Sequence, residues 1–145
     1  MRIKLDIKIE EPDPSAIYNK LKRVLWKSIN KMHDLAVNYA PADTGRLKQS
    51  IAFYPYWQGE TEYILTDGVD YGIHVEFGTA PHHVPITPLK DWARRVLGDE
   101  SLAYAVEKKI SRQGTAAQPF FRPALEQVKL YWTPTFYEQV MAQPE

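Results

Sequence analysis

Hydrophobic residues recur along the chain at two spacings, and each spacing predicts a kind of element. In residues 2–10, Ile and Leu alternate with charged residues, and this period of two predicts a strand with one buried face. From Pro14 to about Tyr39 the hydrophobic positions follow at steps of three and four, which predicts one long amphipathic helix. Asp13 and Pro14 suit its first turn, and Pro41 ends it.

The middle of the chain has the pattern of strands joined by short turns. Three strands are predicted, at residues 51–57, 61–66 and 71–77. The dipeptides Gln58-Gly59 and Asp67-Gly68 separate them and suit tight turns, so an antiparallel meander is the simplest connection. Pro55 predicts an edge position or a bulge in the first of these strands.

The last third of the chain has the pattern of helices again. Helices are predicted at residues 87–97, at residues 99–112, and from Pro123 onwards with an interruption at Pro134. We therefore expect a single α+β domain over residues 1–145. Its expected architecture is a small, mostly antiparallel sheet of about four strands, packed by the long N-terminal helix, with additional C-terminal helices.

The composition is that of a globular domain and argues against several classes of function. Hydrophobic residues make up 44% and charged residues 25% of the 145 residues, and the formal net charge is zero. This balance argues against general nucleic-acid binding and against binding to an anionic membrane. The absence of cysteine excludes a disulfide scaffold, a cysteine zinc site and a thiol nucleophile. We expect no cofactor and no membrane partner.

One tripeptide suggests catalysis. Asp43-Thr44-Gly45 matches the tripeptide that supplies one carboxylate of the aspartic-protease dyad, and a homodimer could supply both carboxylates. The context argues against this reading, because Pro41 stands where a buried apolar strand would be needed, and Arg46 would neutralise the site. A helix cap formed by Asp43 or Thr44 is the simpler interpretation, and we assign no catalytic residue.

Histidines suggest a metal site. His74 and Glu76 would share one face of the predicted strand, and His82-His83 follow in a proline-flanked loop. Their spacing matches no metal signature, so we expect no metal.

Aromatic residues gather in the predicted strands. They are Phe53, Tyr54, Tyr56, Trp57, Tyr63 and Tyr71. Base stacking would need basic residues beside them, and residues 51–76 contain none but hold five acidic ones. Core packing and a subunit interface are therefore the favoured roles.

Three longer segments carry a family resemblance when they are taken together. They are residues 40–51 (APADTGRLKQSI), 71–79 (YGIHVEFGT) and 118–126 (QPFFRPALE). Their order and spacing resemble the neck proteins of long-tailed bacteriophages, also called tail-completion, head–tail joining or minor tail-component proteins. The resemblance covers about residues 14 to 130. The strand at residues 2–10 and the tail after Tyr131 fall outside it and are candidates for partner-specific parts.

The resemblance implies a structural virion protein and no enzyme. Such proteins form a ring around the DNA channel between the capsid portal and the tail, with sixfold symmetry favoured and twelvefold possible. Other neck and tail-tube proteins would be partners, DNA would pass without specific binding, and assembly would take place in the host cytoplasm. A tail-tube terminator and a minor capsid component remain as alternatives. Motif residues with an expected structural or assembly role are Asp43, Thr44, Gly45, Leu47, Glu76, Phe77, Gly78, Pro119, Phe120, Arg122 and Pro123.

Two charge contacts are also expected. Arg122 should pair with Glu76 or Asp43, because all three charges lie within the motifs and a partly buried Arg needs a carboxylate. The charge is also polarised along the chain, with ten basic and six acidic residues in 1–50 but three basic and eight acidic residues in 51–100. The acid-rich residues 60–76 would therefore either line the channel or face the basic helix of a neighbouring copy.

Overall fold

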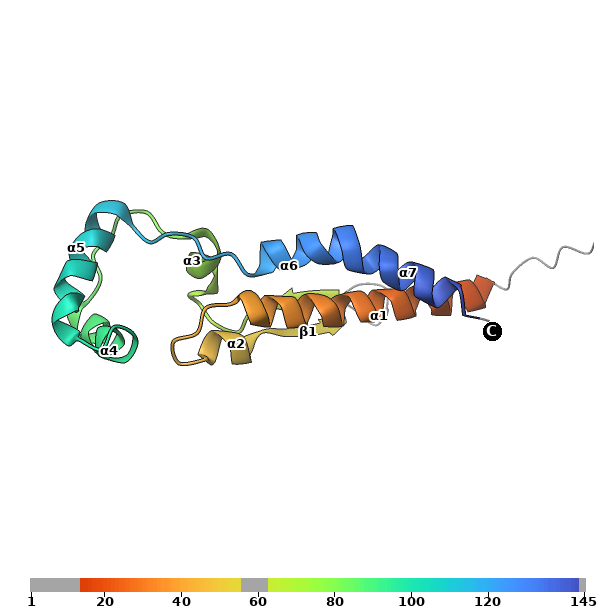
Figure 1. Cartoon of the computed structure of the whole chain (residues 1–145), viewed down its shortest axis with the longest axis horizontal. Coiled ribbons are helices and arrows are strands. Elements are labelled where there is room, and N and C mark those ends of the chain that lie inside the picture. Colours follow the sequence, from red (N-terminus) through yellow and green to blue (C-terminus); the bar gives the residue numbers. More distant parts are fainter. Residues whose placement is uncertain (1–13, 56–62, 144–145) are drawn as a thin grey trace, which may run out of the picture.

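The computed structural model describes residues 14–55 and 63–143, and helices predominate in them (Figure 1). The elements are α1 (Pro14–Tyr39), α2 (Arg46–Ser50), β1 (Ala52–Pro55), β2 (Tyr63–Thr66), α3 (Gly72–Phe77), α4 (Ile86–Val96), a 3-10 turn (Glu100–Leu102), α5 (Ala103–Gln113), α6 (Phe121–Gln127), a π-helical turn (Val128–Trp132) and α7 (Thr133–Met141). We call residues 86–113 the lobe and the remaining described elements the body. The body is elongated, and the lobe lies at one end of it (Figure 1).

The long helix α1 is confirmed and ends at Tyr39, as predicted. The C-terminal helices run along it (Figure 1). Buried Ser28 shares a hydrogen bond of 2.9 Å with the Thr133 hydroxyl of α7. The ammonium of Lys31 lies 4.1 Å from the centroid of the Trp132 ring, a cation–π distance. Part of the basic face of α1 is thus covered by the π-helical turn that precedes α7.

The sheet is smaller than predicted, and the expected four strands are wrong. In the described part of the chain it consists of β1 and β2, paired antiparallel from Ala52 opposite Thr66 to Pro55 opposite Tyr63. These strands lie within two of the predicted ones. The predicted strand at residues 2–10 falls outside the described residues. The fold is therefore a mostly helical α+β arrangement around a two-stranded sheet.

The predicted strand at residues 71–77 is the clearest error, because these residues form helix α3. The N–H of Val75 donates to the carbonyl of Tyr71 at 3.1 Å, which closes a helical turn. Glu76 is buried, while Ile73 and Phe77 are 61% and 64% exposed. Exposed positions four residues apart are the spacing of one helix face. A strand with the apolar Ile73 and Phe77 on its buried face would have had the opposite pattern of burial.

The C-terminal helix pattern is largely confirmed. The lobe helices α4 and α5 lie close to the predicted ranges, and Gly98 between them has a φ of 76°. The last helix begins at Phe121 and widens into the π-helical turn just before Pro134, which lies in the first turn of α7. A proline has no N–H to donate within the helix, which accounts for the predicted interruption.

Two separate hydrophobic clusters hold the body and the lobe. The body cluster contains Ala36, Ala40, Leu47, Ile51, Val69, Phe120 and Ala124. The lobe cluster contains only Leu89, Ala93 and Ala103, with Ile86, Trp92 and Val106 packed against it. Within the described ranges, no helix is both long and apolar enough to cross a membrane.

Candidate assembly site

Two motif segments meet at the carboxylate of Glu76, which is only 5% exposed. Its Oε2 accepts the backbone N–H groups of Phe120 at 2.6 Å and Phe121 at 2.9 Å. Its Oε1 accepts the N–H of Arg122 at 3.0 Å. The first N–H groups of a helix have no partner within the helix, so Glu76 acts as a cap supplied by another element. The negative charge also suits the positive end of the α6 dipole.

The protonation of Glu76 follows from these contacts. Burial opposes the charged form and is the largest single influence on its pKa. The three N–H groups, joined by the positive charge of Arg122, act in the other direction and together outweigh burial, so the pKa of Glu76 is lowered. The carboxylate is therefore ionised at neutral pH.

The remaining motif segment lies in the same core. Leu47 and Ile51 are 4% exposed, Phe120 is fully buried, and all three belong to the body cluster. The rings of Phe120 and Phe121 lie 4.5 Å apart between centroids. Thus all three segments, which are far apart in sequence, come together around Glu76 and Phe120.

The predicted side-chain pairing of Arg122 is wrong. Both oxygens of Glu76 are engaged by backbone N–H groups, and no ion pair joins the Arg122 guanidinium to Glu76 or Asp43 in the described structure. The guanidinium instead lies 5.7 Å from the centroid of the exposed Phe77 ring. Only the backbone of Arg122 meets Glu76.

The chain crosses between body and lobe at two points that lie side by side. The N–H of Thr79 donates to the carbonyl of Thr115 at 3.1 Å, the reverse bond measures 3.3 Å, and the two hydroxyls are 2.9 Å apart. Gly78 and Gly114 precede these residues with φ values of 74° and 72°. A Cβ on Gly114 would come within 1.8 Å of the Thr79 carbonyl oxygen, so the close approach requires glycine there.

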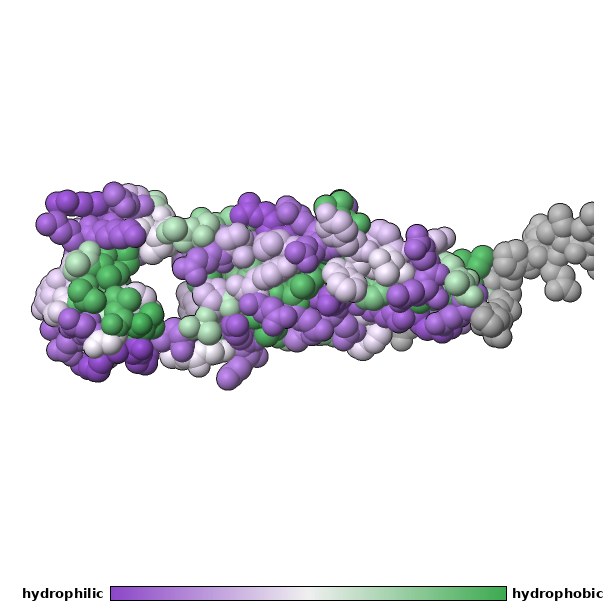
Figure 2. All heavy atoms as spheres, in the orientation of Figure 1, coloured by the Kyte–Doolittle hydropathy of each residue, from purple (hydrophilic) through white to green (hydrophobic). Residues whose placement is uncertain are grey.

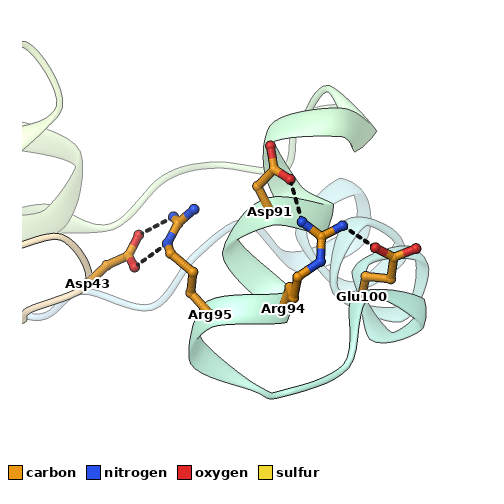
Figure 3. A network of polar contacts seen from close by, with 5 residues as sticks. All are labelled: Asp43, Asp91, Arg94, Arg95 and Glu100. Atoms are coloured by element: carbon orange, nitrogen blue, oxygen red, sulfur yellow. Dashed lines mark hydrogen bonds and ion pairs between the residues drawn. The ribbon is translucent and has the colours of Figure 1, made fainter.

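Asp43 links the body to the lobe (Figure 3). Its Oδ1 accepts from Nε of Arg95 at 3.0 Å, and its Oδ2 accepts from Nη2 at 2.7 Å. Hydrogen bonding to Arg95 is the main cause of the lowered pKa of Asp43. Arg94, next along α4, bonds instead to Asp91 and Glu100 inside the lobe.

The predicted side-chain cap at the start of α2 is wrong for Asp43. The residue at the N-cap is Gly45, which has a φ of 81° and no side chain to cap with. The N–H of Arg46, the first residue of α2, instead donates to the Thr44 hydroxyl at 3.5 Å. The carboxylate geometry also disfavours the protease interpretation. A proton-sharing dyad needs a carboxylate free to face its partner, whereas both oxygens of Asp43 face Arg95.

A cleft of about 990 Å³ separates lobe and body. Figure 2 shows the open space between them, with hydrophobic residues on the adjoining part of the lobe. Its lobe side includes Trp92, Val96 and Ile110, and its body side includes Tyr71 and Val75. Its lining also includes the motif residues Asp43, Thr44, Gly45, Leu47 and Gly78.

The histidines are not brought together as a metal site. Glu76 is engaged by backbone groups, and its position two residues after His74 on a helix directs the two side chains to different sides. Nδ1 of His83 lies 3.0 Å from the Glu107 carboxylate. Within residues 14–55 and 63–143, no group of three potential ligands is placed to hold a metal ion.

The aromatic residues divide between a half-buried cluster against α1 and the exposed surface. Phe53 and Tyr63 pack against Trp26 of α1, with ring centroids 5.5 and 5.9 Å from it. Tyr54 and Tyr71 are exposed. Tyr56 and Trp57 fall outside the described residues.

Several site residues escaped the sequence analysis. Arg95 carried no signal, because its partner is 52 positions away. Thr79 and Thr115 likewise pair over a long separation. Gly114 could have been noticed, since it follows a predicted helix as Gly98 does. Of the remaining predicted residues, Pro119 and Pro123 flank the first residues of α6, next to the Glu76 contacts.

Comparison with known proteins identifies no relative of this chain. No protein-family model matches the chain, and neither the curated proteins nor the solved structures include a match.

Proposed function

We propose that this chain is a structural assembly protein of the head–tail neck of a long-tailed bacteriophage, where copies form a ring around the DNA channel. The observation that carries the proposal is the convergence of the three resembling segments on Glu76 and Phe120. The three resembling segments thus belong to one structural unit of the body. Their residues contact each other here through backbone hydrogen bonds and core packing.

The surface supports an assembly role. Large apolar side chains are strongly exposed on several elements: Ile73, Phe77, Leu130 and Tyr131 are 61%, 64%, 64% and 67% exposed. The lobe exposes more of them near its turn, at Val96, Leu97, Leu102 and Tyr104. The group at the turn of the lobe is the kind of local apolar exposure that a protein–protein contact can cover. A subunit buried in a ring has partners that would cover it.

Interrupting the gene in the phage or prophage that encodes it tests the proposal. Electron microscopy of the lysate should show filled heads beside separate tails of normal length. Tails of uncontrolled length would replace the joining role by a tail-terminator role. Intact infectious particles would contradict the proposal altogether. A plasmid copy of the intact gene should restore joined particles and serves as the control.

A further inference from the structure

The cleft between lobe and body combines apolar walls with one cation, Arg46, that has no partner among the described residues. Val96 and Ile110 contribute to the lobe wall, Val75 to the body wall, and Val84 lines the cleft from the connection that leads into the lobe. Arg46, at the start of α2, also lines the cleft. Among the residues described, its guanidinium takes part in no ion pair or hydrogen bond. The cleft therefore suits an apolar segment that carries negative charge.

The only carboxylate that lines the described cleft does not neutralise Arg46. This carboxylate is Asp43, and both of its oxygens bond to Arg95. His74 and His82 also line the cleft and can add positive charge but no negative charge. Arg46 is exposed, so a negative group of a partner has access to its guanidinium.

We propose that residues 56–62 of a second copy occupy this cleft. This segment joins β1 to β2 and has the sequence YWQGETE, so it combines Tyr56 and Trp57 with Glu60 and Glu62. The aromatic residues match the apolar walls, and the two carboxylates match Arg46. The inference rests on the proposed function, because it supplies the contact between neighbours in the ring.

The segment of the same copy cannot reach its own cleft. Its hairpin lies beside the middle of α1, since the Tyr63 ring is 5.9 Å from the Trp26 ring. From residue 26 to residue 39, α1 rises about 20 Å before the cleft begins. β1 leads away from the lobe (Figure 1). Held at both ends, residues 56–62 extend at most about 13 Å.

The contact therefore joins different surfaces of two copies. The hairpin of one copy meets the cleft of the next, which is a heterologous arrangement. Repetition of such a contact generates a ring when the rotation closes. The acid-rich hairpin would then lie against the neighbouring subunit, one of the two locations predicted for residues 60–76.

Charge reversal tests the contact in the full-length chain. Sedimentation velocity over a range of concentrations should show association of the wild type. Arg46→Glu, and separately Glu60→Lys with Glu62→Lys, should weaken association at least about tenfold, and combining the reversals should restore much of it. Lys48→Glu on the same helix is the matched control and should associate as the wild type does. A wild type that stays monomeric, or reversals without effect, would overturn the inference.

Photocrosslinking identifies the occupant directly. A benzoylphenylalanine at position 57 should crosslink to a peptide containing residues 43–47 of another copy, and mixing isotopically labelled and unlabelled chains identifies the link as intersubunit. Crosslinks within one copy, to another part of the chain, or to a different virion protein would overturn the inference. If the reversals also leave virion assembly normal, the ring contact is wrong while the proposed neck function stands. If gene interruption leaves particles intact, the proposed function itself fails.

Discussion

Glu76→Gln should destabilise the fold by a predictable amount. The substitution keeps the size of the side chain but leaves one oxygen for three N–H donors. With the amide oxygen at the Oε2 position it still accepts from Phe120 and Phe121, while its NH2 group then faces the N–H of Arg122. A buried donor without a partner costs about 1–3 kcal/mol. Loss of the charge at the helix N-terminus adds about 0.3–1 kcal/mol.

The expected loss in unfolding free energy is therefore about 1.3–4 kcal/mol, out of the roughly 5–15 kcal/mol typical of a domain. Urea denaturation followed by circular dichroism at pH 7 measures it. Glu126→Gln is the control, because Glu126 is exposed on the same helix and should change stability by less than about 0.5 kcal/mol.

The difference between wild type and Glu76→Gln should also depend on pH. Because the pKa of Glu76 is lowered in the folded chain, its ionised form stabilises the fold. That contribution is complete above the unfolded-state pKa, near 4.3, and is lost as the pH falls through the lower folded pKa. The two unfolding free energies should therefore converge as the pH falls from the unfolded-state pKa through the lowered folded pKa of Glu76. A pH-independent difference, or one below about 0.5 kcal/mol at pH 7, would refute the capping role.

Three further predictions concern the junction of lobe and body and the turn before α3. Gly114→Ala should lower the unfolding free energy more than Gly98→Ala does. Gly98 shares the positive φ but has open space around it, so its substitution should cost about 1–2 kcal/mol. Equal losses in urea titrations would contradict the close approach of the chain at Gly114. Asp43→Ala should broaden the distribution of distances between spin labels on the body, at Lys48→Cys, and on the lobe, at Lys109→Cys. Arg94→Ala removes contacts inside the lobe and should leave the distribution unchanged. An unchanged distribution in Asp43→Ala would show that the Arg95 contact does not hold the lobe. Burial raises the pKa of Asp67 despite the opposing hydrogen bond from Val69, so the stability that the protonated Asp67 contributes is lost as the pH rises. Asp67→Asn keeps an acceptor and should leave the melting temperature at pH 7 unchanged or higher. A clear fall in the melting temperature would contradict this.

The elements with strong local patterns could be predicted from the sequence. The steps of three and four in α1 extend over many turns, and Pro41 marks its end, so sequence reasoning placed it closely. The stretch 71–77 is too short to repeat a helical spacing over many turns, and its alternation of apolar and polar residues is equally typical of a strand. The deciding fact is tertiary, because Glu76 is drawn inward by N–H groups that lie 44 to 46 positions later.

The candidate site was predictable only in part. Three of the motif residues, Leu47, Glu76 and Phe120, lie in one region of the body, while their role in assembly stays a prediction. Their roles were not predicted, because a carboxylate in the same local sequence can cap a helix, pair with a cation or coordinate a metal ion. The lobe and its link to Asp43 depend on where two distant connections cross, which no local pattern records.

Gold labelling of intact particles tests the central proposal most directly. An antibody against this chain, applied to purified virions and viewed by electron microscopy, should label the junction between head and tail. Particles from the interrupted gene should carry no label and serve as the control. Label spread along the tail or over the capsid, or no label on intact virions, would contradict a role in the neck.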